Sequence, residues 1–326
     1  MKNRQVRDLA WAINSPSLIQ RQFGWPSIVD SPSIQQDHWV SQWLLSLESD
    51  PSALKSHLAQ EKSHFIGAYF ESLWAFYLHS NPRYELIAKN LQANSKTRTE
   101  GEFDFIVLDN DSGHYIHQEI AIKFYLGFSQ QNLYRFSDKK NIWLGPQCKD
   151  RLDVKMDKMI NSQIKLSSKD SGKQALRSIN IDPDANSIKS QLLVKGYLFY
   201  PTTPSVIAPV FCNQSHLRGR WFTLSEFSAY IEQSDFDAWA LLTKPEWVSP
   251  YQAGISTFNS AVLNNNHENR FTEKPNVIWT TKEKVTTEGR PWMIACLTKR
   301  DNDYIEVERL FAVPDDWPAI DNKITL

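Results

Sequence analysis

Charged side chains interrupt two otherwise apolar segments of the chain, residues 101–107 and 117–126. Both segments are rich in β-branched and aromatic residues, which favour strands. The sequence between them at 109–113, DNDSG, is typical of a turn, so we predict an antiparallel hairpin. The charged residues of this hairpin that could do chemistry are Glu102, Asp104, Glu119 and Lys123.

The spacing of these residues predicts which of them share a face. Because side chains alternate along a strand, Glu102 and Asp104 should point to one side of the first strand. Glu119, Ala121 and Lys123 should likewise point to one side of the second strand. Charges within such apolar runs are costly if they are buried without partners. Three carboxylates and an ammonium on one hairpin therefore predict a divalent-metal site.

The strongest helix prediction, residues 62–79, precedes the hairpin. Its apolar positions recur at helical spacing and leave little polar surface; they include Ile66, Phe70, Leu73 and Tyr77. Glu71 lies in the middle of this apolar helix, and Pro82 ends it. The pattern leaves two interpretations of Glu71 open, since it can join the acidic residues of the hairpin or face solvent.

A second predicted helix, residues 149–166, follows the hairpin and carries Arg151, Lys155 and Lys158 along one side. This basic row suits contact with the phosphates of a nucleic acid. Aspartates are interleaved with the basic residues, so a solvated, salt-bridged helix face is the alternative.

Weaker signals for ligand binding occur elsewhere. Arg218 and Arg220 flank Gly219 next to Trp221, which suits nucleic-acid backbone contact and stacking, and equally a surface cation–π cluster. His114 and His117 near Glu119 could ligate a transition metal, but histidines at such positions are more often plain surface or core residues.

Composition narrows the class of protein. The 326 residues are 41% hydrophobic and 22% charged, which is ordinary for a globular protein. The formal net charge of −1 gives no global nucleic-acid signature, so any basic surface must be local. Three widely spaced cysteines support neither a zinc site nor a disulfide framework. No apolar stretch approaches the length of a transmembrane helix, and we expect a cytoplasmic protein without a membrane partner.

The chain divides into three parts by pattern. Residues 1–60 predict a helical lead-in, residues 61–204 an α/β core, and residues 205–326 a mixed α+β elaboration or a small second module. A buried strand is predicted at 192–200. The predictions for the last part are strands at 206–211, 278–280, 292–298 and 304–312, a helix at 224–231, a short element at 238–242 and a polar loop at 260–269.

The order of helix, acidic hairpin, helix and strand resembles the PD-(D/E)XK, or restriction-endonuclease-like, superfamily. Within it the chain is similar to a bacterial family described only as a domain of unknown function. The segments that carry the resemblance are Gly67–Glu71, Gly101–Phe105, Glu119–Gly127, and Trp143–Pro146 leading into Lys149–Leu152. The family likeness extends through Lys195–Pro201 and Arg290–Ala295. The resemblance implies a central mixed β-sheet flanked by helices.

The resemblance also implies a Mg²⁺- or Mn²⁺-dependent nuclease that acts on DNA in preference to RNA. Asp104 would be the central metal ligand and Glu119 the second, while Glu71 would add a ligand or orient a metal-bound water. Lys123 would lie near the attacking water and the charge developing on the phosphate. Supporting positions behind these ligands would be occupied by Glu102 and Gln118.

One departure from the superfamily pattern concerns the acidic residue that normally stands two positions before the lysine. Here that position is Ala121, and Glu119 stands four residues before Lys123, a strand distance of about 13 Å instead of about 7 Å. A bulge could shorten the distance and could also turn Gln118 towards the site. Alternatively, Glu119 fills the usual carboxylate place and Lys123 reaches back. The third possibility is a catalytically inactive fold that binds nucleic acid or a protein.

Overall fold

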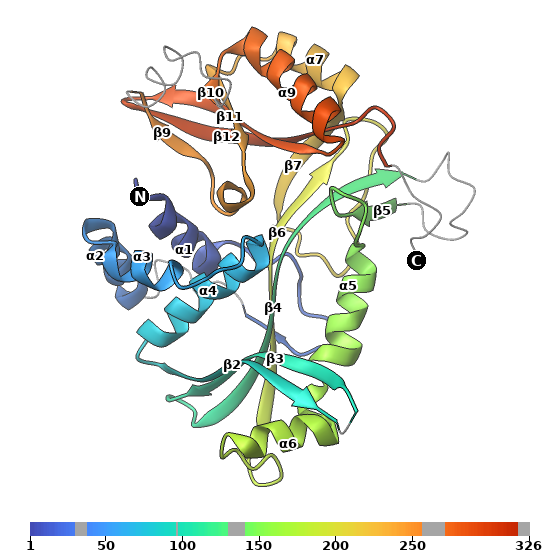
Figure 1. Ribbon diagram of the computed structural model, residues 1–326. Helices are drawn as coiled ribbons and strands as arrows, with labels where there is room; N and C mark the ends of the chain where they lie inside the picture. Colours follow the sequence, from blue (N-terminus) through green and yellow to red (C-terminus); the bar gives the residue numbers. More distant parts are fainter. Residues whose placement is uncertain (30–37, 96, 130–140, 256–270, 319–326) are drawn as a thin grey trace.

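Twelve strands form one mixed sheet in the computed structural model, which describes residues 1–29, 38–95, 97–129, 141–255 and 271–318 (Figure 1). Along the sheet the order is β10-β8-β11-β12-β7-β6-β4-β3-β2, while β1 pairs with β6, β5 with β4 and β9 with β12. The strand bounds are β1 Ser27–Ile28, β2 Tyr84–Asn94, β3 Thr99–Asp109, β4 His114–Ser129, β5 Asn141–Leu144, β6 Ile188–Tyr200, β7 Leu217–Thr223, β8 Ala238–Leu242, β9 Gln252–Gly254, β10 Phe271–Thr272, β11 Trp292–Arg300 and β12 Asp303–Val313.

Helices cover both faces of this sheet. Their bounds are α1 Arg4–Asn14, α2 His38–Ser49, α3 Ser52–Leu58, α4 Ile66–Ser80, α5 Leu152–Lys158, α6 Asp170–Ser178, α7 Leu224–Gln233 and α9 Lys274–Glu288. A π-helix, Met159–Gln163, continues α5, and short 3₁₀-helices span Leu166–Ser168 and Lys244–Trp247. The structure is therefore an α/β fold with a large mixed sheet flanked by helices.

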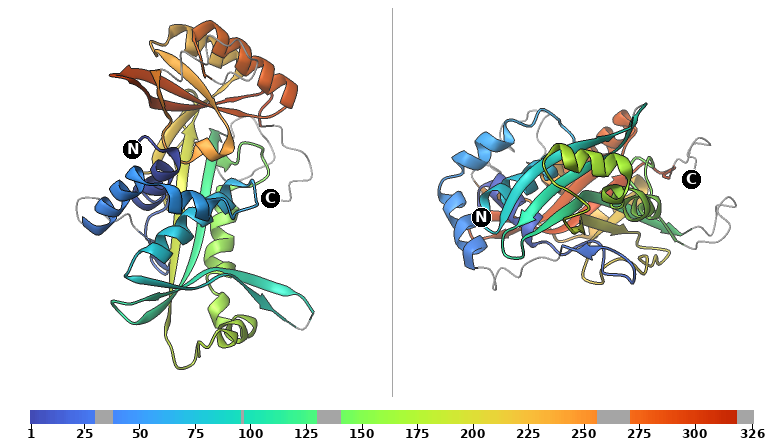
Figure 2. Two further views of the ribbon diagram at one scale, coloured as in Figure 1. Left: turned by 60° about the vertical axis from the view of Figure 1, so that its left-hand side comes forward. Right: turned by 90° about the horizontal axis from the view of Figure 1, so that it is seen from below.

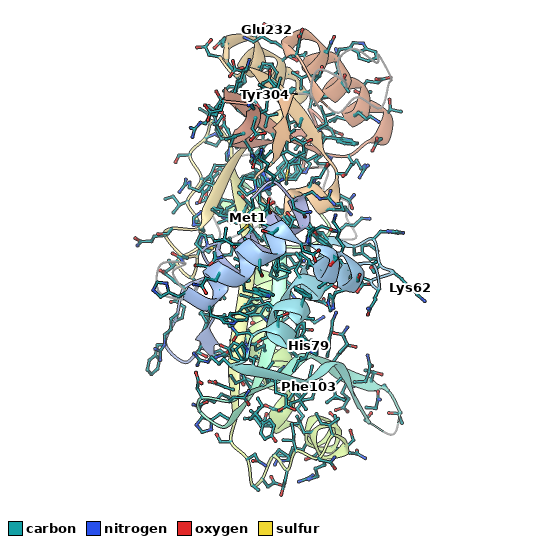
Figure 3. All side chains as sticks on the ribbon, turned by 90° about the vertical axis from the view of Figure 1, so that its left-hand side faces the viewer. Met1, Lys62, His79, Phe103, Glu232 and Tyr304 are labelled. Carbon is teal, nitrogen blue, oxygen red and sulfur yellow. The ribbon has the colours of Figure 1, made fainter. Side chains whose placement is uncertain are left out.

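The long strands β4 and β6 run through the middle of the molecule and join its two ends (Figure 1). At one end β2, β3 and β4 pair antiparallel. At the centre β4, β6, β7 and β12 pair parallel, and at the other end β12, β11, β8 and β10 pair antiparallel. In Figure 3, Phe103 on β3 and Tyr304 on β12 mark these opposite ends.

The two faces of β4 pack against different helices. Ile120, Ile122 and Phe124 belong to a core shared with α1–α4, whereas Ala121 and Tyr125 pack with residues of α5 such as Met156. The end-on view in Figure 2 shows α1–α4 on one side of the sheet and α5 on the other. Because both faces of β4 are covered, its sequence is an almost continuous apolar run, as is typical of central parallel strands.

The far end of the sheet has its own helical layer. The helices α7 and α9 cover one face of β7, β8, β11 and β12 (Figure 1). On the other face Met293, Phe311 and neighbouring side chains join the same core as α1 and α4. One hydrophobic core therefore continues from β3 to β11 across the whole sheet.

Most of the predicted elements are confirmed. The hairpin of β3 and β4, the helix α4, the buried strand β6, the helix α7 and the strands β11 and β12 lie where the patterns place them. The predicted strand at 278–280 is wrong, because these residues lie inside α9. The predicted strand at 206–211 is irregular backbone, and the predicted helix at 149–166 divides into α5, the π-helix and a 3₁₀-turn. The predicted loop at 260–269 lies outside the described residues.

Candidate active site

Asp104 lies at the point where β3 and β4 separate. The two strands stay paired as far as Phe105 and Gln118. Beyond this pair, Oδ2 of Asp104 accepts a hydrogen bond from the backbone N–H of Ile120 at 2.9 Å. A side-chain carboxylate thus takes a main-chain donor of β4, and the divergence of the strands leaves the Asp104 carboxyl partly open to solvent.

Glu119, the opposite acidic residue, is completely enclosed, with 0% of its surface exposed. Its Oε1 lies 3.0 Å from Nε2 of His117, and its Oε2 accepts a hydrogen bond from Nε2 of Gln163 at 2.9 Å. The Glu119 and Asp104 carboxyls also lie close enough to influence each other's pKa. The hairpin therefore brings Asp104 and Glu119 together.

This juxtaposition perturbs the proton equilibria of the site. Burial, and then the charge of Glu119, raise the pKa of Asp104 to about 7, and burial raises the pKa of Glu119 to about 7. Two adjacent buried carboxyls cannot both ionise cheaply, so the pair shares a proton near neutral pH. Burial lowers the pKa of His117 to about 4, so its imidazole is neutral there and shares a hydrogen bond between Nε2 and the Glu119 carboxyl.

The π-helix after α5 supplies the remaining contacts of Glu119. The N–H of Ile164 bonds to the carbonyl of Met159 at 3.0 Å, which widens the turn and shifts the side chains that follow. Gln163, at the end of this turn, reaches Glu119 with its N–H and accepts from Nζ of Lys155 at 3.2 Å. π-Turns of this kind frequently accompany functional sites.

Lys155 is the ammonium that acts on the acidic pair. Its charge opposes the upward pKa shifts of both Asp104 and Glu119. Burial, and then the charge of Lys123, lower the pKa of Lys155 itself. A half-buried ammonium joined to Glu119 through Gln163 can stabilise negative charge that develops beside the pair.

Lys123 has a different partner. Its Nζ lies 2.7 Å from Oδ2 of Asp150, which also accepts a hydrogen bond from the hydroxyl of Tyr125 at 3.2 Å. The register of β4 with β6 is unbroken from Tyr115 to Leu126, so no bulge shortens the distance between Glu119 and Lys123. The structure therefore brings Glu119 to Asp104 while Lys123 is held at Asp150.

The other predicted acidic and amide residues surround the pair unequally. Glu71 lines a pocket of about 250 Å³ together with Lys123 and Lys155, and burial, then Asp104, raise its pKa. Glu102 and Asp104 line a second pocket of about 400 Å³. Gln118 faces the other side of the sheet, where it accepts from Nε1 of Trp74 at 3.0 Å. The strand period predicted that orientation, because no bulge reverses it.

The predicted basic residues are scattered. Arg151 pairs with Asp153 at 2.7 Å, and Lys158 is exposed along the pocket that contains Asp104. Arg218 stacks 3.8 Å from the ring centre of Tyr200 on β6, and Arg220 pairs with Glu308 and Tyr230. Only Lys155 and Lys158 are brought to the acidic pair, whereas Arg218 and Arg220 belong to the far part of the sheet.

The family model described as domain of unknown function DUF1853 matches residues 7–313. The chain belongs to this DUF1853 family. No curated protein and no solved structure matches it. The matched range of this DUF1853 chain includes the acidic pair, Lys155 and both pockets. No helix in the described part of this DUF1853 chain is both long and apolar enough to cross a bilayer.

The donor set of the DUF1853 site is small. Within the ranges that the structure describes, no three His, Cys, Asp or Glu side chains gather closely enough to hold a metal ion by themselves. Asp104 and Glu119 offer two carboxylates, and Mg²⁺ is commonly bound by one or two carboxylates completed by water and substrate phosphate. The pair fits an ion of this kind, because a cation would stabilise the ionised carboxylates that burial disfavours.

Sequence reasoning did not find the roles of Gln163 and Asp150. Gln163 was the polar member of the apolar side of the predicted helix, and that mismatch was a usable signal. Asp150 lies in the loop before α5 and meets Lys123 only through the tertiary fold. His117, considered above as a transition-metal ligand, instead orients Glu119.

Proposed function

We propose that this DUF1853 protein is a Mg²⁺- or Mn²⁺-dependent nuclease that hydrolyses phosphodiester bonds of nucleic acid, DNA in preference to RNA. The observation that carries the proposal is the juxtaposition of the Asp104 and Glu119 carboxyls where β3 and β4 separate. Strongly perturbed carboxyls joined to a specific ammonium are typical of functional sites.

The fold around the pair supports the same proposal. The antiparallel β2–β3–β4 unit continues into parallel β6, with α4 on one face and α5 on the other. A central mixed sheet flanked by helices is what the resemblance to the PD-(D/E)XK superfamily implies, and this arrangement agrees with that expectation. It is support from likeness of fold, and the chemistry is argued from the site.

Each residue then has a defined task. Asp104 and Glu119 would hold the divalent ion, which supplies Lewis acidity and a more acidic water. Gln163 and His117 fix the orientation of the Glu119 carboxylate. Lys155 balances the negative charge that grows on the phosphate oxygens, and Glu71 orients water from the wall of the neighbouring pocket.

The experiment is cleavage of supercoiled plasmid and of a single-stranded oligonucleotide in Mg²⁺, Mn²⁺ or EDTA. We expect Asp104→Asn and Glu119→Gln to lose about 100-fold or more in rate, and Lys155→Met to lose a comparable amount. The matched control is Lys299→Met, an exposed lysine of β11 that lines neither pocket, whose rate should stay within a few fold of the native rate. Calorimetry should show Mn²⁺ binding that Asp104→Asn abolishes. Unchanged cleavage in both carboxylate variants would refute the proposal.

A second candidate function is a catalytically inactive module that binds nucleic acid or a protein. Two observations favour it: Glu119 is fully enclosed, and Lys123 is paired with Asp150. This candidate predicts salt-dependent oligonucleotide binding or capture of a protein, with neither Mn²⁺ binding nor cleavage. The same calorimetric titration therefore separates the two functions.

A further inference from the structure

The pocket of about 250 Å³ beside the acidic pair gathers three lysines from distant parts of the chain. Lys123 comes from β4, Lys155 from α5, and Lys244 from the 3₁₀-helix that follows β8. The rest of the lining is the start of α4 and the segment of β4 next to Glu119, namely Phe65, Ile66, Gly67, Phe70, Glu71 and Ile120–Ile122. The far part of the sheet thus contributes one cation to a pocket that the core otherwise builds.

Lys244 is placed by a rigid turn. Thr243 and Glu246 form a capping box, in which Oε2 of Glu246 accepts from the N–H and the hydroxyl of Thr243 at 2.8 Å each. Nε1 of Trp247 donates to the carbonyl of Leu242 at 3.1 Å, and its ring packs edge-on against Phe124 of β4. These contacts fix the turn against the core.

The charges of the pocket favour an anion. Three ammoniums and one carboxyl, that of Glu71, line the same small volume. Asp150 already pairs with the ammonium of Lys123, so Lys155 and Lys244 are the lysines that would bind an anionic ligand. The ammoniums of the three lysines repel one another in this partly enclosed space, which a bound anion would relieve. Lysine ammoniums are common binders of phosphate. The N-cap residue of α4 is Phe65, whose side chain cannot accept a hydrogen bond, so the N-terminal amides of α4 add to the same preference.

An aromatic ring completes the pocket. Phe65 lines it, yet 73% of Phe65 is exposed. Exposed aromatic rings beside a basic groove stack unpaired bases of single-stranded nucleic acids. One nucleotide would therefore occupy both positions, with its phosphate against the lysines and its base on the ring of Phe65.

We infer that this pocket is a nucleotide subsite, in which Lys155 and Lys244 bind a backbone phosphate of a single-stranded segment and Phe65 stacks the adjoining base. The inference deepens the proposed function, on which it rests for the choice of nucleic acid as the ligand. It names an unpaired strand as the substrate class and gives the C-terminal part of the chain a place at the site.

The test is fluorescence anisotropy with labelled oligothymidylate in EDTA, where no metal-dependent cleavage can occur. We expect Lys244→Met to weaken binding about tenfold and to reduce the salt dependence by about one phosphate contact. Phe65→Ala should weaken binding about tenfold for oligothymidylate but leave an abasic oligomer of equal length unaffected. The matched controls are Lys299→Met and Phe23→Ala, both exposed residues away from the pocket lining, which should bind like the native chain.

The outcomes separate this inference from the proposed nuclease activity. If Lys244→Met and Lys299→Met bind alike, the subsite is wrong even if cleavage depends on Asp104. If Lys244→Met is selectively weak, Lys244→Arg restores binding and no cleavage is found, the subsite stands and the nuclease proposal falls. Displacement of the oligomer by equimolar inorganic phosphate or thymidine monophosphate would show that the pocket takes free phosphates, which overturns the strand assignment.

Discussion

Arg309 on β12 and Glu119 on β4 are both enclosed by protein, with 2% and 0% of their surfaces exposed. The guanidinium of Arg309 has Glu306 at 2.7 Å, the carbonyl of Ser249 at 2.8 Å and the ring of Tyr197 at 4.7 Å. Burial alone would lower the pKa of Arg309, but Glu306 raises it above its usual value. The far end of the sheet thus neutralises its buried charge locally.

The end of the sheet that contains Asp104 and Glu119 does not neutralise its buried charge in this way. Among the described residues, the structure gives Asp104 and Glu119 no ion pair with any lysine or arginine, and the nearest ammonium reaches Glu119 only through Gln163. Burial therefore raises the pKa of both carboxyls, and the charge of Glu119 raises that of Asp104 further. A buried charge with an ion-pair partner stabilises one structure, whereas a carboxyl pair that is hydrogen-bonded but not ion-paired remains available to a cation.

Among the substitutions that test this contrast, Arg309→Met should have the largest effect on the free energy of unfolding. The substitution leaves the Glu306 carboxylate buried without its partner and should lower the free energy of unfolding by about 3–5 kcal/mol in urea titrations. Arg218→Met, at an exposed arginine stacked on Tyr200, is the control and should change it by less than about 1 kcal/mol. The double variant Arg309→Met with Glu306→Met should regain most of the loss. If the Arg309→Met variant is as stable as the native chain, the ion pair of Arg309 does not stabilise the fold, and the contrast with Asp104 and Glu119 is wrong.

The second effect is a dependence of stability on pH in metal-free protein. The shared proton of Asp104 and Glu119 has a folded pKa of about 7, raised from unfolded values of 3.8 and 4.5. The folded state therefore holds this proton more tightly, so its contribution is full below about pH 4 and is lost as pH rises towards 7. The loss is on the order of 3 kcal/mol for one shared proton. The free energy of unfolding of Asp104→Asn, measured against pH, should differ from that of the native protein between about pH 4 and 7. If the two curves superimpose, Asp104 and Glu119 are not a coupled pair.

A divalent cation should restore part of that stability. At pH 8 both carboxyls are ionised, so an ion bound between them removes the repulsion. At a concentration of Mg²⁺ ten times its dissociation constant, mass action predicts a gain of about 1.4 kcal/mol in the free energy of unfolding. Asp104→Asn should show no gain, whereas Lys299→Met, at an exposed lysine outside both pockets, should respond like the native protein. A gain of equal size in Asp104→Asn would place the ion elsewhere.

The sequence could predict the strands and helices whose pattern is local. Turn residues at 109–113 and alternating apolar runs define the hairpin, and the stripe at 62–79 defines α4. The predicted strand at 278–280 is wrong because a run of three apolar or β-branched residues is too short to distinguish a strand from a helix by periodicity. For the site, the pattern found Asp104 and Glu119, since strand pairing is itself local in a hairpin.

The remaining features of the site depend on contacts between distant segments. The ion pair of Lys123 with Asp150 forms only when the loop before α5 folds back over β4. The π-turn is a single-residue irregularity without a sequence signature, yet it decides where Gln163 points. Lys244 enters the pocket from a turn 121 residues after Lys123 in the chain. Such placements follow from tertiary packing, which no periodicity encodes.

The smallest expected effect concerns Gln163, the residue that links the two kinds of charge. Gln163→Leu removes the donor to Glu119 and the acceptor for Lys155, and one such buried hydrogen bond contributes about 1 kcal/mol to the free energy of unfolding. Because the side-chain N–H of Gln163 stabilises the ionised form of Glu119, its loss should raise the pKa of Glu119. The pH range over which the free energy of unfolding falls should therefore move upwards. Gln174→Leu, an exposed glutamine of α6, is the control and should change neither quantity. If Gln163→Leu costs stability without moving the window, Gln163 is only a packing residue, and Lys155 must act on the pair without it.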